Sequence, residues 1–362
     1  MSPDIGKEEE KSLIKCVRSK HISQGKFVQK FEKDFSMYLG TKYASAVCNG
    51  TAALHLALVA LGINKKDEVI VPNCTFISTP NAVSYTGAKP VFVDIDETYC
   101  IDPKEIKKAI TKRTKAIIAV HLYGNVADMG WIKKIARKYR LYVIEDCAEA
   151  HGAEYKGKKV GSIGDVGCFS FYGNKIITTG EGGMCVTNNK KLKKRIDFLR
   201  AQGKPKLEDL KPGREYAQMQ FYHHLLAFNY RMTDLQASIG IEQLRKINKI
   251  IKRRMKIASI YEKKIKGFKK PIIKKFTNPV YWFYPILCRT EKEQIIIMNV
   301  LRKKGIILRS FFYPCNKQPF YFEKKDLRFS IEVNKKGILL PTDIEIKDAE
   351  EITYTLNKLS KR

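Results

Sequence analysis

The chain has 362 residues, 44% of them hydrophobic, and it carries a formal net charge of +31. It is long enough for one large and one smaller domain, and it holds no apolar run that could span a bilayer. Its first residues lack the basic and apolar segments of a signal peptide, so we expect a cytoplasmic protein with no membrane partner.

Neither the cysteines nor the lysines form a familiar binding motif. None of the nine cysteines has the paired close spacing of a zinc site, and several lie in apolar runs, so we expect neither a metal nor a disulfide framework. The excess lysines are spread in short pairs such as Lys190-Lys191 and Lys303-Lys304, without a basic tail. We therefore expect a lysine-rich solvated surface and no nucleic-acid partner, although a positive field also suits a phosphorylated ligand.

The first part of the chain contains a candidate anion site. Amphipathic helices are predicted for residues 8–18 and about 27–39. A strongly apolar helical run over 52–62 then follows Asn49-Gly50-Thr51, which places free N–H groups of small residues at a helix N-terminus, a geometry that binds anions. Most helix starts bind nothing, so this evidence is weak by itself. His55, on the apolar face of the run, is expected to be a core histidine rather than a catalyst.

Strands and helices alternate through the middle of the chain. Strands are predicted over 68–71, 90–94, 116–120 and 141–144, and helices over 103–110 and 129–139. This rhythm indicates a mainly parallel sheet covered by helices. The last of these strands leads into Asp146, at the sheet edge where ligands of open α/β sheets bind. On position alone, Asp146 fits a functional acid and a helix cap equally well.

Lys175 lies between two apolar runs. Residues 168–172 form a predicted buried strand, Gly180-Glu181-Gly182-Gly183 a tight return and 184–187 the next strand, so Lys175 falls on the loop that joins them. Apolar surroundings disfavour the charged form of an amine, which is what a Schiff-base lysine needs in order to react at neutral pH. The alternative is a loop lysine that points into water.

The remainder of the chain predicts a second, smaller unit. A helix is expected from about Lys190 to Gln202, a polar loop over 203–216, and a long helix from Thr233 to about Ile265. Short strands within 280–288 and further helices follow. We predict an α/β protein with a large domain at 1–240 and a smaller α+β domain at 241–362.

Three of these features together fit pyridoxal 5′-phosphate. This cofactor requires a phosphate site, a carboxylate for its pyridinium nitrogen and an amine for covalent attachment. The helix start at Gly50, the strand end at Asp146 and the loop at Lys175 supply them in this order. The carboxylate keeps the ring nitrogen protonated, and a protonated ring is the better electron sink. No single feature is specific, but the set predicts a pyridoxal-phosphate enzyme.

Nearly the whole chain resembles the DegT/DnrJ/StrS nucleotide-sugar aminotransferases, which have the type I aspartate-aminotransferase fold: a large domain with a mixed, mainly parallel sheet and a smaller C-terminal α+β domain. The matching segments are Ser23-Gln24-Gly25, Asn49-Gly50-Thr51-Ala52-Ala53-Leu54, His121-Leu122-Tyr123-Gly124, Glu145-Asp146-Cys147-Ala148-Glu149-Ala150-His151-Gly152, Phe169-Ser170-Phe171 through Lys175 to Gly183, and Asn229-Tyr230-Arg231-Met232-Thr233.

The resemblance implies a role for each site residue. Lys175 would bind the cofactor covalently and move protons, and Asp146 would pair with the ring nitrogen. Phe76 would stack on the ring, and Glu149 would lie beside the ring hydroxyl. The remaining roles would be phosphate binding by Gly50, Thr51, Ala52 and Ser170, a contact from Asn229 to the phosphate in the neighbouring subunit of a homodimer, and substrate contacts by Arg231, Tyr313 and Asn316. Two positions depart from the family pattern: many relatives have Gln at Glu149, and a His is common at Asn316.

Within this family the chain is similar to the enzymes that make perosamine-type and viosamine-type sugars. The resemblance therefore implies transfer of an amino group from L-glutamate, through the pyridoxamine form of the cofactor, to carbon 4 of a GDP-, UDP- or dTDP-linked 4-keto-6-deoxyhexose. A transferase acting at carbon 3 is the first alternative. The family's dehydratase branch replaces the lysine by His, which Lys175 argues against. A non-catalytic or nucleic-acid-binding protein is the third alternative.

Overall fold

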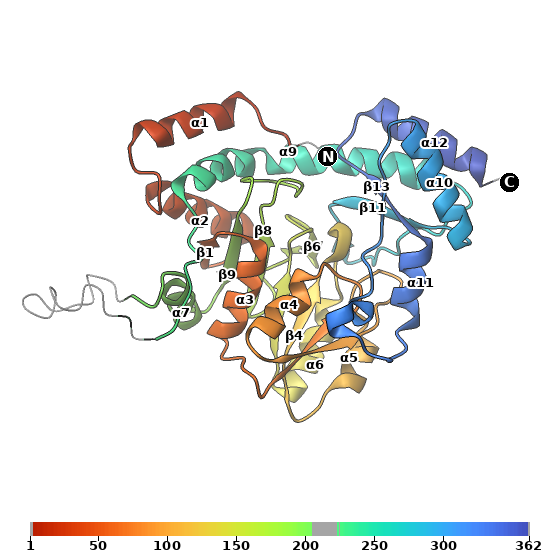
Figure 1. Ribbon diagram of the computed structural model, residues 1–362. Helices are drawn as coiled ribbons and strands as arrows, with labels where there is room; N and C mark the ends of the chain where they lie inside the picture. Colours follow the sequence, from red (N-terminus) through yellow and green to blue (C-terminus); the bar gives the residue numbers. More distant parts are fainter. Residues whose placement is uncertain (1–2, 205–222, 224, 361–362) are drawn as a thin grey trace, which may run out of the picture.

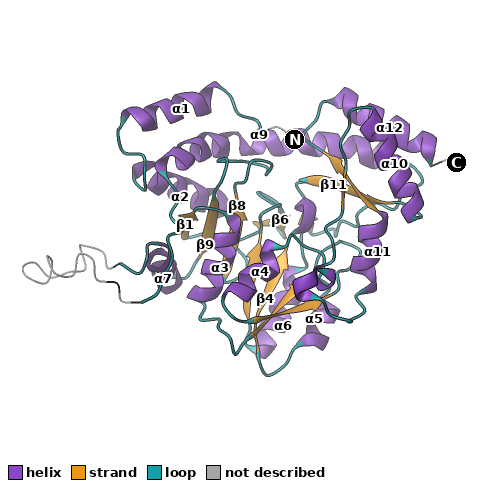
Figure 2. Ribbon diagram, in the orientation of Figure 1, coloured by secondary structure: helices purple, strands orange, loops and turns teal. Residues whose placement is uncertain are grey.

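A seven-stranded sheet forms the centre of the larger part of the molecule (Figures 1 and 2). The computed structural model describes residues 3–204, 223 and 225–360. The strand order is β1-β9-β8-β5-β4-β2-β3, and β9 runs antiparallel to both of its neighbours while the other pairs are parallel. The strands are Tyr43–Val47 (β1), Glu68–Pro72 (β2), Lys89–Val93 (β3), Thr114–Val120 (β4), Tyr142–Asp146 (β5), Val166–Ser170 (β8) and Gly183–Thr187 (β9).

Helices cover this sheet, which explains its apolar sequence. β2, β8 and β9 are buried at every position, as expected for strands with both faces covered. α3 packs on β8 and β9, α6 on β4 and β5, and α2 on β1. The helices of this part are Lys7–Arg18 (α1), Lys26–Leu39 (α2), Gly50–Ala60 (α3), Ser78–Tyr85 (α4), Pro103–Ala109 (α5), Met129–Tyr139 (α6) and Lys190–Arg200 (α7).

The long helix α9 (Asp234–Lys264) connects the two parts of the molecule. Thr233 caps its start and forms a capping box with Gln236, as the start signals predicted. The Asp234 carboxylate accepts the backbone N–H of Gly25 and of Val28, both at 2.9 Å, and so joins the start of α9 to the start of α2. α9 packs against α1, α2 and α12 and runs across the upper part of the molecule in Figure 1, below α1. The proposed domain boundary at residue 240 falls inside this helix.

The smaller part has its own sheet and apolar cluster. The sheet order is β11-β13-β12, and the cluster includes Tyr261, Tyr284 and Leu340, all fully buried. Its elements are Phe283–Leu287 (β11), Glu291–Lys303 (α10), Arg309–Ser310 (β12), Arg328–Lys336 (α11), Gly337–Pro341 (β13) and Ile346–Leu359 (α12). A third, minor sheet joins Glu154–Tyr155 (β6), Lys158–Lys159 (β7) and Thr277–Asn278 (β10), and short 3-10 turns span Leu122–Gly124 (η1), Cys315–Lys317 (η3) and Pro319–Tyr321 (η4).

The predicted fold class is confirmed, with two differences in detail. The strand expected at 168–172 lies two residues earlier, at Val166–Ser170, and α4 was not predicted because Pro80 and Asn81 are weak helix formers. Most of the loop expected at 203–216 lies outside the described residues. Among the helices of the described residues, none is long and apolar enough to cross a membrane.

Candidate active site

A cavity of about 550 Å³ lies at the carboxyl ends of β4, β5 and β8 and at the start of α3. Seven of the predicted site residues line it: Gly50, Thr51, Phe76, Asp146, Glu149, Ser170 and Lys175. Residues separated by more than a hundred positions are therefore brought to one sheet edge, the place where open α/β sheets bind ligands.

The start of α3 leaves backbone donors facing this cavity. The Asn49 side chain accepts the Ala52 N–H at 2.8 Å, so the N–H groups of Gly50 and Thr51 remain available, because first-turn donors have no partner within a helix. Gly50 also has to be small, since a Cβ there would lie 2.7 Å from the Ser170 Cβ. Backbone N–H groups next to the Ser170 hydroxyl, at the positive end of a helix dipole, suit a phosphate.

Lys175 lies on the loop between β8 and β9, as predicted, and it points inward rather than into water. Its side chain is 11% exposed, and Nζ lies 3.6 Å from Glu149 Oε1 and 4.0 Å from the centre of the Trp282 ring. Burial lowers the pKa of Lys175 below that of an ordinary lysine, although the charges of Glu149 and Asp146 oppose this. The amine is therefore easier to deprotonate than a surface amine, which a nucleophile requires.

Asp146 ends β5 and turns its carboxylate into the cavity. Oδ2 accepts the Thr79 hydroxyl at 2.8 Å, and Oδ1 accepts the Ala148 N–H at 3.2 Å. Burial raises the pKa of Asp146, against the hydrogen bond from Thr79. A turn and not a helix follows β5, so the helix-cap alternative is wrong. A buried carboxylate with a raised pKa favours a cationic partner, such as a protonated ring nitrogen.

Glu149 completes the polar side of the cavity. Its Oε2 accepts the Tyr123 N–H at 2.9 Å, while Oε1 faces Lys175. Burial raises the pKa of Glu149 to about 7, and the nearby Lys175 limits this rise. Phe76, 54% exposed in the single chain, packs its ring 5.7 Å from that of Phe312 and presents an aromatic surface at the cavity.

Five predicted residues do not line the cavity of the single chain. The Ala52 N–H is already taken by Asn49, and Asn316 is fully buried, with its amide donating to the Lys325 carbonyl at 3.0 Å. Asn316 thus makes no substrate contact in this conformation. The other three are Asn229, Arg231 and Tyr313. Asn229 and Tyr313 are exposed, which leaves them open to a second subunit or a ligand.

The structure adds lining residues that the sequence did not reveal. Thr79 of α4 holds Asp146, and Trp282 lies under Lys175 while donating its ring N–H to the Asn174 carbonyl at 2.7 Å. Arg309 and Phe312 also reach the cavity from the smaller part of the chain. Among these residues, only Thr79 lies close in the sequence to a predicted site residue that lines the cavity, Phe76. The residues of the smaller part have no such neighbour.

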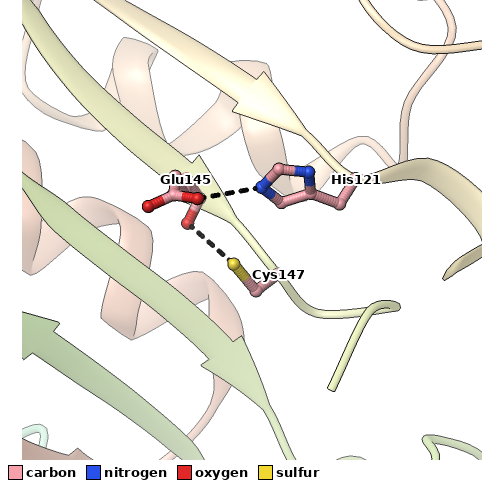
Figure 3. A group of neighbouring side chains, drawn as sticks. All are labelled: His121, Glu145 and Cys147. Carbon is pink, nitrogen blue, oxygen red and sulfur yellow. Dashed lines mark hydrogen bonds and ion pairs between the residues drawn. The ribbon is translucent and has the colours of Figure 1, made fainter. Parts of the chain in front are cut away.

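Next to the cavity, His121, Glu145 and Cys147 form a buried cluster that resembles a metal site (Figure 3). His121 Nε2 lies 3.2 Å from Glu145 Oε2, and Nδ1 accepts the Ala127 N–H at 3.2 Å, so Nε2 carries the proton and donates it. The Glu145 oxygens also accept N–H groups of the segment 161–164, and the Cys147 thiol donates to the Glu145 carbonyl at 3.8 Å. Each polar atom is already paired, so this cluster is structural.

The arrangement of the cavity thus defines a pyridoxal-phosphate enzyme of α/β fold. The start of α3 with Ser170 fits the phosphate, Asp146 fits the ring nitrogen, and the buried amine of Lys175 fits the covalent bond. In the comparisons with known proteins, the model of the DegT/DnrJ/EryC1/StrS aminotransferase family matches residues 3–359. The chain belongs to this family, which confirms the predicted enzyme class and its cofactor.

Three relatives show how far the similarity extends. The chain is 42% identical to the GDP-perosamine synthase of Escherichia coli O157:H7, over 99% of this chain and 96% of that protein. It is 41% identical to the GDP-perosamine synthase of Caulobacter vibrioides, over 96% and 94% of the two chains. The crystal structure of S. venezuelae DesV in complex with a ketimine intermediate superimposes with a TM-score of 0.89 at 30% identity, covering 98% of this chain and 95% of that one.

Proposed function

We propose that this enzyme transfers an amino group from L-glutamate to carbon 4 of a GDP-linked 4-keto-6-deoxyhexose and so makes a 4-amino-4,6-dideoxy sugar of the perosamine type. The observation that carries this proposal is the similarity to two GDP-perosamine synthases along nearly the full length of each chain. A transferase acting at carbon 3 finds no comparable support. The net charge of +31 suits an anionic nucleotide substrate.

In this proposal six cavity residues have a chemical task. The bound cofactor supplies an electron sink for the carbanion that forms when a proton leaves the carbon next to the substrate nitrogen. Lys175 carries that proton, a role suited to an amine whose pKa is lowered by burial. Asp146 holds a positive charge on the ring nitrogen, and Phe76 fixes the orientation of the ring. Gly50, Thr51 and Ser170 bind the phosphate.

We also propose that the working unit is a homodimer with shared sites. Asn229 and Arg231 lie just before α9, outside the cavity of their own chain, and Asn229 is exposed. In a dimer, Asn229 would bind the phosphate in the other subunit and Arg231 would approach the substrate. Tyr313, which is 56% exposed, would contact the sugar nucleotide from its own chain.

A substrate panel tests the reaction. The enzyme is incubated with L-glutamate and with GDP-, UDP- and dTDP-linked 4-keto-6-deoxy sugars, with Lys175→Ala as the inactive control. We expect formation of 2-oxoglutarate with the GDP sugar, and a product whose NMR spectrum places the nitrogen on carbon 4. Nitrogen on carbon 3, or a preference for UDP or dTDP, would contradict the proposal. Retention on heparin at physiological salt, without amination of any sugar, would favour the nucleic-acid alternative.

A further inference from the structure

Lys175 has one carboxylate within ion-pair distance among the described residues, and it is that of Glu149. Nζ lies 3.6 Å from Glu149 Oε1, and the two side chains are 11% and 5% exposed. Asp146 also lies near, but its oxygens accept the Thr79 hydroxyl and the Ala148 N–H. Glu181 lines the same cavity without an ion pair to Lys175. The pair of Lys175 and Glu149 is therefore a specific contact.

The two oxygens of Glu149 have different environments. Oε2 is fixed by the Tyr123 N–H at 2.9 Å, which leaves Oε1 directed at the amine. Tyr123 is itself held firmly, because its hydroxyl accepts the Phe312 N–H at 3.0 Å and its ring is fully buried. It also adopts a left-handed backbone conformation, with φ of 56°, which is uncommon for a residue other than glycine. The orientation of Oε1 is thus built into the fold.

Burial opposes two separate charges in such a pair. It lowers the pKa of Lys175 and raises the pKa of Glu149 to about 7, so the two groups approach each other in proton affinity. A pair of this kind titrates as one unit. Many relatives in this family have Gln at the position of Glu149. A glutamine could accept the Tyr123 N–H, but it could neither take a proton nor carry a charge.

We propose that Lys175 and Glu149 share one proton in the active site, and that Glu149 keeps this proton when the Lys175 amine reacts with an aldehyde. The neutral amine adds to the carbonyl carbon, its two hydrogens leave with the carbonyl oxygen as water, and a nitrogen–carbon double bond remains. The proton on Glu149 is neither consumed nor released. This inference rests on the proposed role of Lys175 and adds a proton partner for it.

The other groups around the pair do not replace Glu149 in this role. Asp146 and Arg309 affect the pKa of Lys175 in opposite directions. Burial keeps Tyr123 and Cys74, beside the Glu149 carboxyl, protonated and neutral. Burial also lowers the pKa of His151 to about 3, so this histidine is neutral when Glu149 titrates.

The test measures the reactivity of Lys175 toward an aldehyde as a function of pH. The full-length chain, freed of cofactor, is treated with limiting formaldehyde and cyanoborohydride, and methylation of Lys175 is measured by peptide mass spectrometry. In Glu149→Gln the amine loses its negative neighbour, so its pKa falls and more of it is neutral at a given pH. We expect the midpoint of labelling to shift to lower pH by about one unit or more. The same change at Glu181, Glu181→Gln, should leave the midpoint unchanged.

A second measurement uses the loaded enzyme. The pH at which the absorbance of bound pyridoxal 5′-phosphate changes should also fall in Glu149→Gln and stay constant in Glu181→Gln. If Glu149→Gln does not fold, Glu149→Asp replaces it, and its longer separation should shift the midpoint the same way by a smaller amount. Superimposable profiles for wild type and the Glu149 variant would overturn the inference. Covalent cofactor on another lysine would instead overturn the proposed role of Lys175.

Discussion

The Thr79 hydroxyl donates a hydrogen bond of 2.8 Å to Asp146 Oδ2, and this contact joins α4 to the end of β5 inside the cavity. Thr79 is fully buried, and its oxygen also lies 3.0 Å from that of Thr75. Burial favours the neutral form of the Asp146 carboxyl, and the hydrogen bond from Thr79 favours the charged form. Two predictions about the cofactor follow, one for each partner.

Replacing Thr79 by Val should weaken cofactor binding without disrupting the core, because the two side chains have the same shape. A hydrogen bond to an ionised group contributes about 1.5–3 kcal/mol, so we expect a dissociation constant for pyridoxal 5′-phosphate about ten to a hundred times higher. Equilibrium dialysis with absorbance detection measures this constant.

Replacing Asp146 by Asn should leave the cofactor bound through its phosphate and Lys175, but the variant should lose most of its transamination activity. Near-normal turnover in Asp146→Asn would show that the carboxylate does not serve the ring nitrogen.

Replacing Lys175 by Ala should abolish turnover while the fold remains intact, because the side chain lines a cavity. Borohydride reduction of the wild-type enzyme, followed by peptide mapping, should place the cofactor on Lys175. Circular dichroism and melting temperature serve as controls for the fold. Recovery of the label on any other lysine would contradict the assignment.

The local parts of the site were predictable from the sequence, and the distant parts were not. Gly50, Asp146 and Lys175 each carry a local signal: a helix start, a strand exit and a loop between two apolar strands. Trp282 and Arg309 have no such signal, because only the packing of the smaller part on the larger one brings them to the cavity. The buried position of Asn316 was not predictable for a related reason, since a resemblance to a family pattern does not show that the side chain turns inward to the Lys325 carbonyl.

The same limit applies to secondary structure. The long helix after Thr233 was predictable because its cap and its apolar period agree. α4 was not, since its eight residues contain Pro80 and Asn81 and it is stabilised mainly by packing against α3. Tertiary contacts outweigh helix propensity in so short an element.

The buried Glu145 should be a determinant of stability and not a metal ligand. Burial raises its pKa, but hydrogen bonds from His121, Gly164 and Gly161 offset this and leave the pKa below its ordinary value of 4.5. A carboxyl with a depressed folded-state pKa stabilises the protein above its unfolded-state pKa, and this contribution is lost as pH falls through the folded-state value. The melting temperature should therefore decline as the pH falls below about 4.5.

Removing this carboxylate should be costly at neutral pH. Glu145→Leu leaves the N–H groups of Gly161, Ile163 and Gly164 without acceptors, so we expect a loss of about 3 kcal/mol or more in the free energy of unfolding. Denaturant unfolding measures it, with Glu10→Leu at an exposed position of α1 as the matched control. A chelator should change neither stability nor activity. A drop in melting temperature on addition of EDTA would show that the cluster binds a metal.

The shared-site proposal makes the most specific prediction, and it rests on Asn229. This residue forms an isolated bridge with Ala201, is exposed and lies outside its own cavity, so we expect it to contact a phosphate in another subunit. An amide can donate to a phosphate without adding charge, and Asn229→Ala should weaken cofactor retention by about one to two orders of magnitude. Asn229→Asp should weaken cofactor retention further, because a carboxylate repels the phosphate.

Mixing the Lys175→Ala and Asn229→Asp variants then tests whether sites are shared. A hybrid dimer has one site with both Lys175 and Asn229 intact, so up to half of the sites in the hybrids should work. Subunit exchange is followed with differently tagged chains. Mixtures that exchange subunits and yet stay inactive would rule out sites built from two chains.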